Sequence, residues 1–131
     1  MFEFHGWAVL RHHTHDTEDA EQELQIEKLF DFIEGVDSEG VITRKIRNGL
    51  VSLEISGLHN HRQQYVFDLF KKIAELLPGS YGLLYIYDDE DIGKNHDHSN
   101  EFVVFKLVRG HLIQEQDYYL SPYIPTVEDN G

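Results

Sequence analysis

Nine histidines make metal ligation the first chemistry to consider in this 131-residue sequence. Three histidine groups contain an H-x-H pair, a spacing that places both imidazoles on one face of a strand, where they can bind zinc. These groups are His12-His13-x-His15, His59-x-His61 and His96-x-His98. All of them fall in expected loops or at the ends of expected elements, where spacing alone fixes no geometry. We therefore expect no metal site and no cofactor; a metal- or small-ligand-binding domain that uses these loop histidines is the alternative.

A run of four consecutive carboxylates follows an apolar, aromatic stretch in PGSYGLLYIYDDED, residues 78–91. The stretch from Tyr81 to Tyr87 suits a strand at the centre of a sheet or one covered on both faces. Such a strand would hold the acidic run rigidly in a loop, although repulsion among its charges costs stability. We interpret the run as an interaction surface, with a solvated hairpin loop as the alternative. Its residues are Asp88, Asp89, Glu90 and Asp91, and Asp97 lies further along the same loop.

Residues near the C-terminus form a second candidate interaction surface. Tyr118 and Tyr119 follow Asp117 and precede two prolines. Tyrosine is enriched at protein interfaces. Tyrosines within expected strands, such as Tyr81, are more often core residues with a solvated hydroxyl.

Patterns that would indicate catalysis are missing from the sequence. The acidic run lacks the alternating spacing of a calcium-binding EF-hand loop. Exposed neighbouring carboxylates also imply no pocket that would separate their pKa values for acid–base work. No serine stands in a nucleophile elbow, and there is no phosphate-binding glycine motif. We therefore expect a protein that is not an enzyme.

The charge balance points to a basic partner. The chain has 11 Lys and Arg against 24 Asp and Glu, a net charge of −13. Such a field repels nucleic acid and anionic membranes and attracts basic proteins. The chain has no cysteine, its first residues resemble no secretory signal, and no apolar stretch approaches the ~18 residues of a membrane span. We expect a cytoplasmic protein with neither a nucleic-acid nor a membrane partner.

Hydrophobic periodicity predicts a single α+β domain over residues 1–131. Asn48-Gly49 is a strong hairpin signal, and Asn60 with Gln63 resembles a helix capping box. The order β-α-β-β-α-β-β predicts a ferredoxin-like variant, a mostly antiparallel sheet with two helices on one face. Its opposite face then needs cover from the C-terminal tail or from a partner, including a second copy in a homodimer. Expected strands span 2–10, 41–47, 50–56, 81–87 and 101–108, expected helices span 18–34 and 62–77, and Leu112 with Ile113 can continue as a short strand.

Several stretches taken together resemble the Immunity protein 7 family of bacterial polymorphic toxin systems. They are EFHGWAVLR (3–11), SGLHNHR (56–62), IAELLPGSYGLLYIYDDED (73–91), NEFVVFKLVRG (100–110) and LSPYIPTVED (120–129). The resemblance implies a cytoplasmic antidote that binds the toxic C-terminal domain of a cognate secreted toxin, frequently a nuclease. It implies an inhibitor without catalytic residues, and it assigns no contact residue to this chain.

The resemblance agrees with the charge of the chain. Nucleases carry positively charged sites because they bind phosphate. A carboxylate cluster can occupy such a site and compete electrostatically with the substrate. The candidate contacts with the toxin are therefore the acidic run, Asp97, and the segment from Asp117 to Tyr119.

Overall fold

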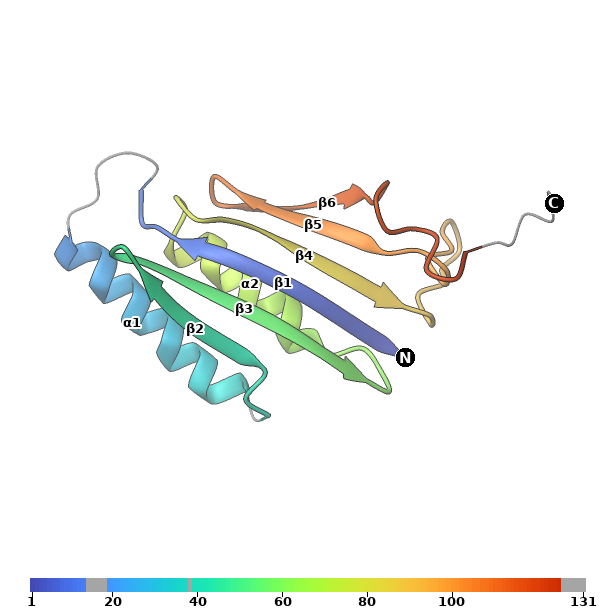
Figure 1. Cartoon of the computed structure of the whole chain (residues 1–131), viewed down its shortest axis with the longest axis horizontal. Helices are drawn as coiled ribbons and strands as arrows, with labels where there is room; N and C mark the ends of the chain where they lie inside the picture. Colours follow the sequence, from blue (N-terminus) through green and yellow to red (C-terminus); the bar gives the residue numbers. More distant parts are fainter. Residues whose placement is uncertain (14–18, 38, 126–131) are drawn as a thin grey trace.

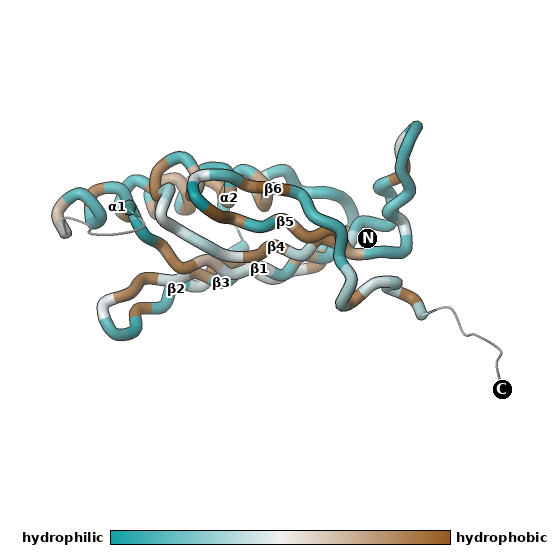
Figure 2. The backbone as a smooth tube through the Cα atoms, turned by 90° about the horizontal axis from the view of Figure 1, so that it is seen from above, coloured by the Kyte–Doolittle hydropathy of each residue, from teal (hydrophilic) through white to brown (hydrophobic). Residues whose placement is uncertain are grey.

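The computed structural model describes residues 1–13, 19–37 and 39–125 of the chain. One sheet is backed by two helices (Figure 1), which lie on the same side of it when the molecule is turned by 90° (Figure 2). Neither described helix is long and apolar enough to cross a membrane. The elements are β1 (Phe2–Leu10), α1 (Asp19–Val36), β2 (Ile42–Arg47), β3 (Leu50–His59), α2 (Gln64–Leu76), β4 (Tyr81–Asp88), β5 (Val103–Val108) and β6 (His111–Gln116).

The sheet order confirms the predicted fold class. The strands run β2-β3-β1-β4-β5-β6, and each neighbouring pair is antiparallel. The first four have the split order of a ferredoxin-like fold, in which β1 lies between β3 and β4, the two strands that α2 connects. The final hairpin, β5–β6, widens the sheet beyond β4. This α+β arrangement leaves one face of the sheet without helices.

Side-chain alternation along the central strands builds the core. Phe2, Phe4, Ala8 and Leu10 of β1 are all fully buried toward the helices, as the alternation in the sequence predicts. On α2 the buried residues recur at helical spacing and meet this face. They are Val66, Phe67, Leu69, Phe70, Ile73 and Ala74.

Three local predictions differ from the structure. The expected capping box is wrong: α2 begins at Gln64, and Gln63 at its N-cap makes no side-chain capping hydrogen bond. Asn60 instead follows β3 directly, because β3 pairs with β1 as far as Phe2 opposite His59. The fifth strand begins at Val103 rather than at residue 101, since the Phe102 amide donates to Ser121 Oγ. The short strand at Leu112 and Ile113 is part of the longer β6.

The C-terminal tail covers one end of the helix-free sheet face. Tyr123 stacks on Tyr87, with ring centroids 3.6 Å apart, and its hydroxyl donates to Glu3. The opposite end remains open, where Trp7 and Tyr81 are 41% and 42% exposed. Of the covers expected for this face, the tail or a partner, the tail therefore provides one at this end.

Candidate interaction site at one end of the sheet

The acidic run, Asp88 to Asp91, forms a turn after β4, here called the acidic turn, and Asp88 is its buried member. It is the last residue of β4, on the strand face that also carries Leu84 and Ile86, and it is 5% exposed. Its carboxylate accepts hydrogen bonds from Arg62 Nη1 at 3.2 Å and from the Glu90 amide at 3.1 Å. Asp88 therefore holds the turn against the start of α2 and offers little surface to a partner.

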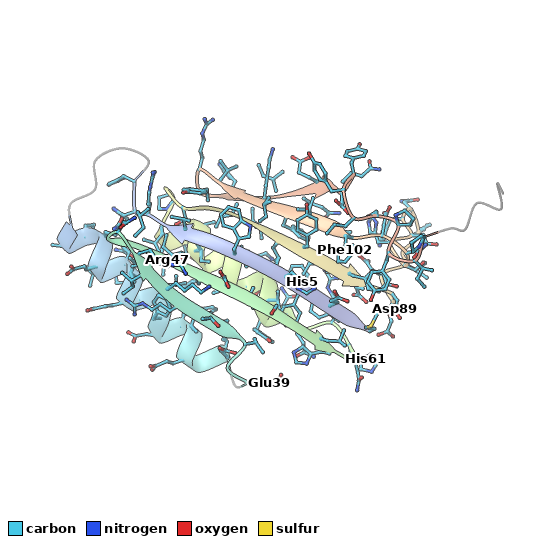
Figure 3. The ribbon with its side chains drawn as sticks, in the orientation of Figure 1. His5, Glu39, Arg47, His61, Asp89 and Phe102 are labelled. Atoms are coloured by element: carbon cyan, nitrogen blue, oxygen red, sulfur yellow. The ribbon has the colours of Figure 1, made fainter. Side chains whose placement is uncertain are left out.

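The other three members of the acidic run also have nitrogen partners. Asp89 Oδ1 lies 2.7 Å from the amino group of Met1, whose pKa is raised chiefly by this hydrogen bond. Figure 3 shows Asp89 at the same end of the sheet as His61, whose Nδ1 is 2.8 Å from Glu90 Oε1. Asp91 Oδ1 is 2.9 Å from His96 Nε2. The acidic run is thus internally compensated, an arrangement that the sequence analysis did not predict.

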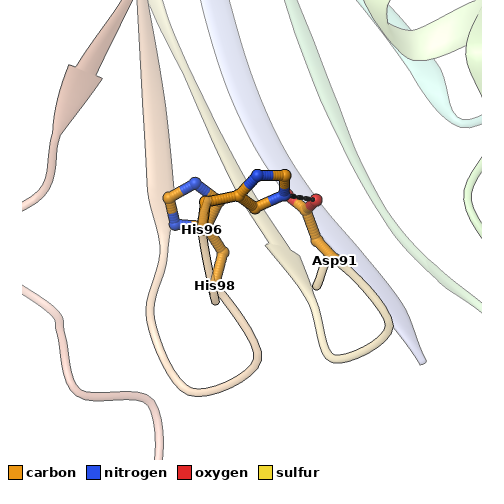
Figure 4. A group of neighbouring side chains, drawn as sticks. All are labelled: Asp91, His96 and His98. Atoms are coloured by element: carbon orange, nitrogen blue, oxygen red, sulfur yellow. Dashed lines mark hydrogen bonds and ion pairs between the residues drawn. The ribbon is translucent and has the colours of Figure 1, made fainter. Parts of the chain in front are cut away.

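A small hairpin after the run brings two histidines together with Asp91 (Figure 4). Ile92 and Asp97 form an isolated antiparallel bridge, and the His98 amide donates to the Asp91 carbonyl at 2.9 Å. One ligand atom from each of Asp91, His96 and His98 lies within 4.8 Å of the others. The structure therefore gives this H-x-H pair a geometry that its spacing alone could not.

The remaining histidine groups do not converge in this way within the described part of the chain. His59 stacks on Phe4 at a centroid distance of 5.7 Å, whereas His61 extends to Glu90. The ring centroids of His12 and His13 are 4.2 Å apart, and His15 lies outside the described residues.

Asp97 pairs with Ile92, so it lies on the opposite face of the hairpin from Asp91, His96 and His98, and it is exposed. Its carboxylate accepts hydrogen bonds from the hydroxyl and the amide of Ser99. These bonds lower the pKa of Asp97 below its ordinary value. Asp97 therefore keeps its negative charge on the outside of the loop.

Asp117 is buried and shapes the second candidate surface. Only 5% exposed, it accepts hydrogen bonds from the Tyr119 amide at 2.9 Å, the Leu120 amide at 3.0 Å and Ser121 Oγ at 2.8 Å. Burial alone would raise the pKa of Asp117, but these hydrogen bonds outweigh it and lower the pKa. These hydrogen bonds fix the segment from Asp117 to Ser121, here called the tyrosine corner, with Tyr118 and Tyr119 in solvent at 78% and 85% exposure.

Hydrogen bonds connect the loop that follows the acidic turn to the segment that follows the tyrosine corner. The Ile124 amide donates to Asn100 Oδ1 at 2.8 Å, and Asn100 Nδ2 donates back to the Ile124 carbonyl at 3.1 Å. Tyr87 at the end of β4 donates its hydroxyl to the Ser99 carbonyl at 2.8 Å. The acidic turn and the tyrosine corner therefore belong to the same end of the sheet (Figure 1).

Two surface features at the far end received no site prediction from the sequence. Trp7 and Tyr81 meet edge to face at 6.1 Å on the open sheet face, with the Arg11 guanidinium 5.8 Å from the Tyr81 ring centroid. A groove between α1 and the β2–β3 hairpin is lined by acidic residues, including Glu23, Glu27 and Asp31. Strand alternation could have indicated the first feature, because it places Trp7 opposite the core residues of β1.

The fold and this end of the sheet define a class: a small acidic α+β protein whose exposed aromatic and carboxylate groups suit contact with another macromolecule. The chain belongs to the Immunity protein 7 family, whose sequence profile matches residues 1–129. It is therefore an immunity protein of toxin systems, and its partner is a toxin. Comparisons with curated proteins and with solved structures gave no match.

Proposed function

We propose that this protein binds the C-terminal toxin domain of a cognate bacterial polymorphic toxin in the cytoplasm and neutralises it without any catalysis of its own. Family membership supports the inhibitory role. The net charge of −13 supports a basic toxin domain, such as a nuclease that binds phosphate.

The tyrosine corner is the observation that carries the proposed site. Tyr118 and Tyr119 are 78% and 85% exposed, yet the buried carboxylate of Asp117 fixes the backbone beneath them. A preorganised segment loses little conformational entropy when a partner binds it. Exposed tyrosines of this kind are frequent anchors of protein–protein interfaces.

The candidate residues divide into two roles at this site. Asp88 and Asp117 are buried and act by positioning the turn and the corner. Direct contact falls to the accessible residues, among which Asp91 is the least exposed. They are Asp89, Glu90, Asp91, Asp97, Tyr118 and Tyr119.

The compensation of the acidic turn is compatible with a basic partner. Glu90 is 57% exposed at its side chain and is paired with His61, which itself is 76% exposed. An exposed pair of this kind contributes little stability, about 0–1 kcal/mol. A lysine or arginine of the toxin can therefore replace His61 at Glu90 at low cost.

Two alternatives rest on their own observations. The open end of the sheet face, with Trp7 and Tyr81, suits association of two copies in a homodimer. Metal binding by loop histidines is favoured by the convergence of Asp91, His96 and His98.

Co-expression with the cognate toxin domain tests the function, scored by cell survival and co-purification. We expect survival with the unaltered protein, and loss of protection when Tyr118→Ala and Tyr119→Ala are combined. Tyr81→Ala, an exposed tyrosine at the other end of the sheet, is the matched control and should protect fully. Cell death with the unaltered protein would contradict the function, whereas full protection by the double variant would contradict only the site.

A further inference from the structure

We infer that the hairpin from Asp91 to Glu101 is a site for one divalent transition-metal ion, with zinc as the best fit, held by Asp91, His96 and His98. The inference is independent of toxin binding. It replaces the expectation from the sequence that no metal site is present.

The hairpin register places the three ligands on one face. Gly93 donates its amide to the His96 carbonyl at 2.8 Å, and His98 donates its amide to the Asp91 carbonyl at 2.9 Å. Residues 91 and 98 are therefore opposite each other, as are 93 and 96, and all four share one side of the ladder. Figure 4 shows Asp91, His96 and His98 gathered on this side.

Gly93 leaves the space that His96 occupies. A Cβ atom at this position would lie 2.2 Å from His96 Cε1 and 2.7 Å from its Nδ1. Any other residue would therefore push the imidazole away from Asp91. The absence of a side chain here lets the ring lie across the hairpin, within 2.9 Å of the carboxylate.

The spacing of the ligand atoms requires only a small adjustment to hold an ion. They lie within 4.8 Å of one another, whereas zinc binds nitrogen and oxygen at about 2.0–2.2 Å, which brings ligand atoms to within about 4 Å of each other. The hydrogen-bonded contact between His96 and Asp91 is the place where the ion would enter. The two imidazole rings are already nearly parallel, at 26° and 4.8 Å between centroids.

Glu101 supports the arrangement from outside the ligand set. Its Oε1 lies 2.5 Å from His98 Nδ1, which fixes the ring and leaves the other nitrogen for the ion. A carboxylate hydrogen-bonded to a ligating imidazole is the usual support of a zinc-binding histidine. Arg62, 4.0 Å from Asp91 Oδ2, restrains the third ligand.

The ligand chemistry selects the class of ion. Two imidazoles with one carboxylate suit zinc and its neighbours in the first transition series, while magnesium and calcium prefer oxygen alone. Three protein ligands leave at least one position for water or for a partner's side chain. The side chains of Asp91, His96 and His98 are 28%, 44% and 24% exposed, so an ion can reach them from solvent.

Zinc titration of the full chain by calorimetry, with ZnCl₂ as the probe, tests the site. We expect one zinc per chain and a melting temperature that rises with zinc concentration. Combining His96→Ala with His98→Ala should weaken binding at least about 100-fold, because two of the three ligands are lost. Glu101→Gln should weaken it about tenfold, as loss of an outer carboxylate does elsewhere.

Two further variants test whether zinc binding depends on the position of His96 and on these histidines in particular. Gly93→Ala removes no ligand but displaces His96, so it should weaken zinc binding while the circular dichroism spectrum stays unchanged. His5→Ala combined with His111→Ala removes two exposed histidines elsewhere and should leave binding intact. The inference is overturned if zinc does not bind the unaltered chain at about 100 μM. It is equally overturned if the His96 and His98 double variant, or Gly93→Ala, binds zinc as tightly as the unaltered chain.

Discussion

The acidic turn and the exposed face of α1 carry similar charge but lie in opposite surroundings. Asp88, Asp89, Glu90 and Asp91 each pair with a base or with the amino group of Met1. On α1 the exposed acids have no ion-pair partner among the described residues, and the last turn has no basic side chain. These acids are Glu23, Glu27, Asp31 and Glu34.

The difference shows that the position of the densest carboxylate run in the sequence does not tell where unpaired negative charge lies on the folded protein. The densest run is a structural feature that fastens the end of β4 to α2. The exposed acids of α1 are spread over several turns and have no ion-pair partner among the described residues, although Arg44 lines the same groove as Glu23, Glu27 and Asp31. We therefore propose that the turn contacts the toxin and that α1 contributes long-range attraction.

Replacing Arg62, the basic residue that pairs with the acidic turn, should cause the largest loss of stability. Arg62→Ala leaves Asp88 buried without its charged partner. Breaking such a pair costs about 3–5 kcal/mol when both groups are buried; Arg62 is 44% exposed at its side chain, so we expect about 2 kcal/mol. Urea unfolding measures the loss. Lys45→Ala, which breaks the exposed pair with Glu54, is the control and should cost less than about 1 kcal/mol. Equal losses in the two variants would show that the turn is no better anchored than an ordinary surface pair.

Asp117→Asn extends the comparison to a carboxylate held by hydrogen bonds alone. The folded-state pKa of Asp117 is lowered, so its charge stabilises the fold above the unfolded pKa of about 4. That contribution is lost as the pH falls through the lower folded-state value. At pH 7 we expect the variant to be about 1–2 kcal/mol less stable, because asparagine keeps one acceptor oxygen while its NH₂ group cannot accept from the backbone amide of Tyr119 or Leu120 that it faces. Unfolding midpoints from pH 7 to pH 2 measure this, and a difference that does not shrink at acid pH would rule out the charge as its cause.

Neutralising the accessible part of the turn should separate contact from attraction. Asp89→Asn with Glu90→Gln removes two exposed charges and keeps Asp88 in place. We expect association with the toxin domain to slow roughly three- to tenfold and dissociation to quicken. Glu23→Gln with Glu27→Gln on α1 should slow association only. Rates measured at low and high salt distinguish the two outcomes, and unchanged dissociation in the turn variant would remove the turn from the interface.

The smallest expected effect is a gain of stability on α1. Glu27 lies four residues from both Glu23 and Asp31, and like charges at this spacing destabilise a helix by about 0.2–0.5 kcal/mol per pair. Glu27→Gln should therefore raise the free energy of unfolding by about 0.5 kcal/mol. Glu75→Gln on α2, which removes an ion pair with Lys72, should produce no gain. A matching gain in both variants would attribute the effect to net charge instead of to the neighbours on α1.

The structure also changes one expectation about the acidic run. From the sequence alone, repulsion among the four charges predicts a stability cost, so neutralising them would leave the fold unchanged or improve it. With Asp88 bound to Arg62 and Asp89 bound to the amino group of Met1, we now expect complete neutralisation to destabilise the fold. These partners lie 26 and 88 residues away along the chain, so no local pattern could have indicated them.

The missed length of β6 has a local explanation. The turn before it consists of Arg109 and Gly110 with φ of 51° and 76°, nearly the same as Asn48 and Gly49 with 51° and 77°. Asn-Gly is a recognised sequence for such a turn, whereas arginine seldom adopts a positive φ. The strand that follows, HLIQEQ, is mostly exposed at the sheet edge and lacks a strong apolar pattern.

The sequence by itself determined the elements whose signals are local. Alternation along β1, helical spacing on α2 and the Asn48-Gly49 turn each reflect interactions within a few residues, and they were enough for the fold class. The family could also be identified from short stretches distributed along the chain.

Only the tertiary structure decided which charges are compensated and which histidines converge. An ion pair depends on where a distant segment returns, and the register of the hairpin from Asp91 to His98 depends on backbone hydrogen bonds that its composition does not specify. Burial is decided in the same way. Asp88 and Asp117 are buried and position the turn and the corner, whereas Tyr118 and Tyr119, which follow Asp117 in the chain, are exposed to solvent. The physical reason is that burial and electrostatic pairing are properties of the packed chain, while periodicity is a property of each segment.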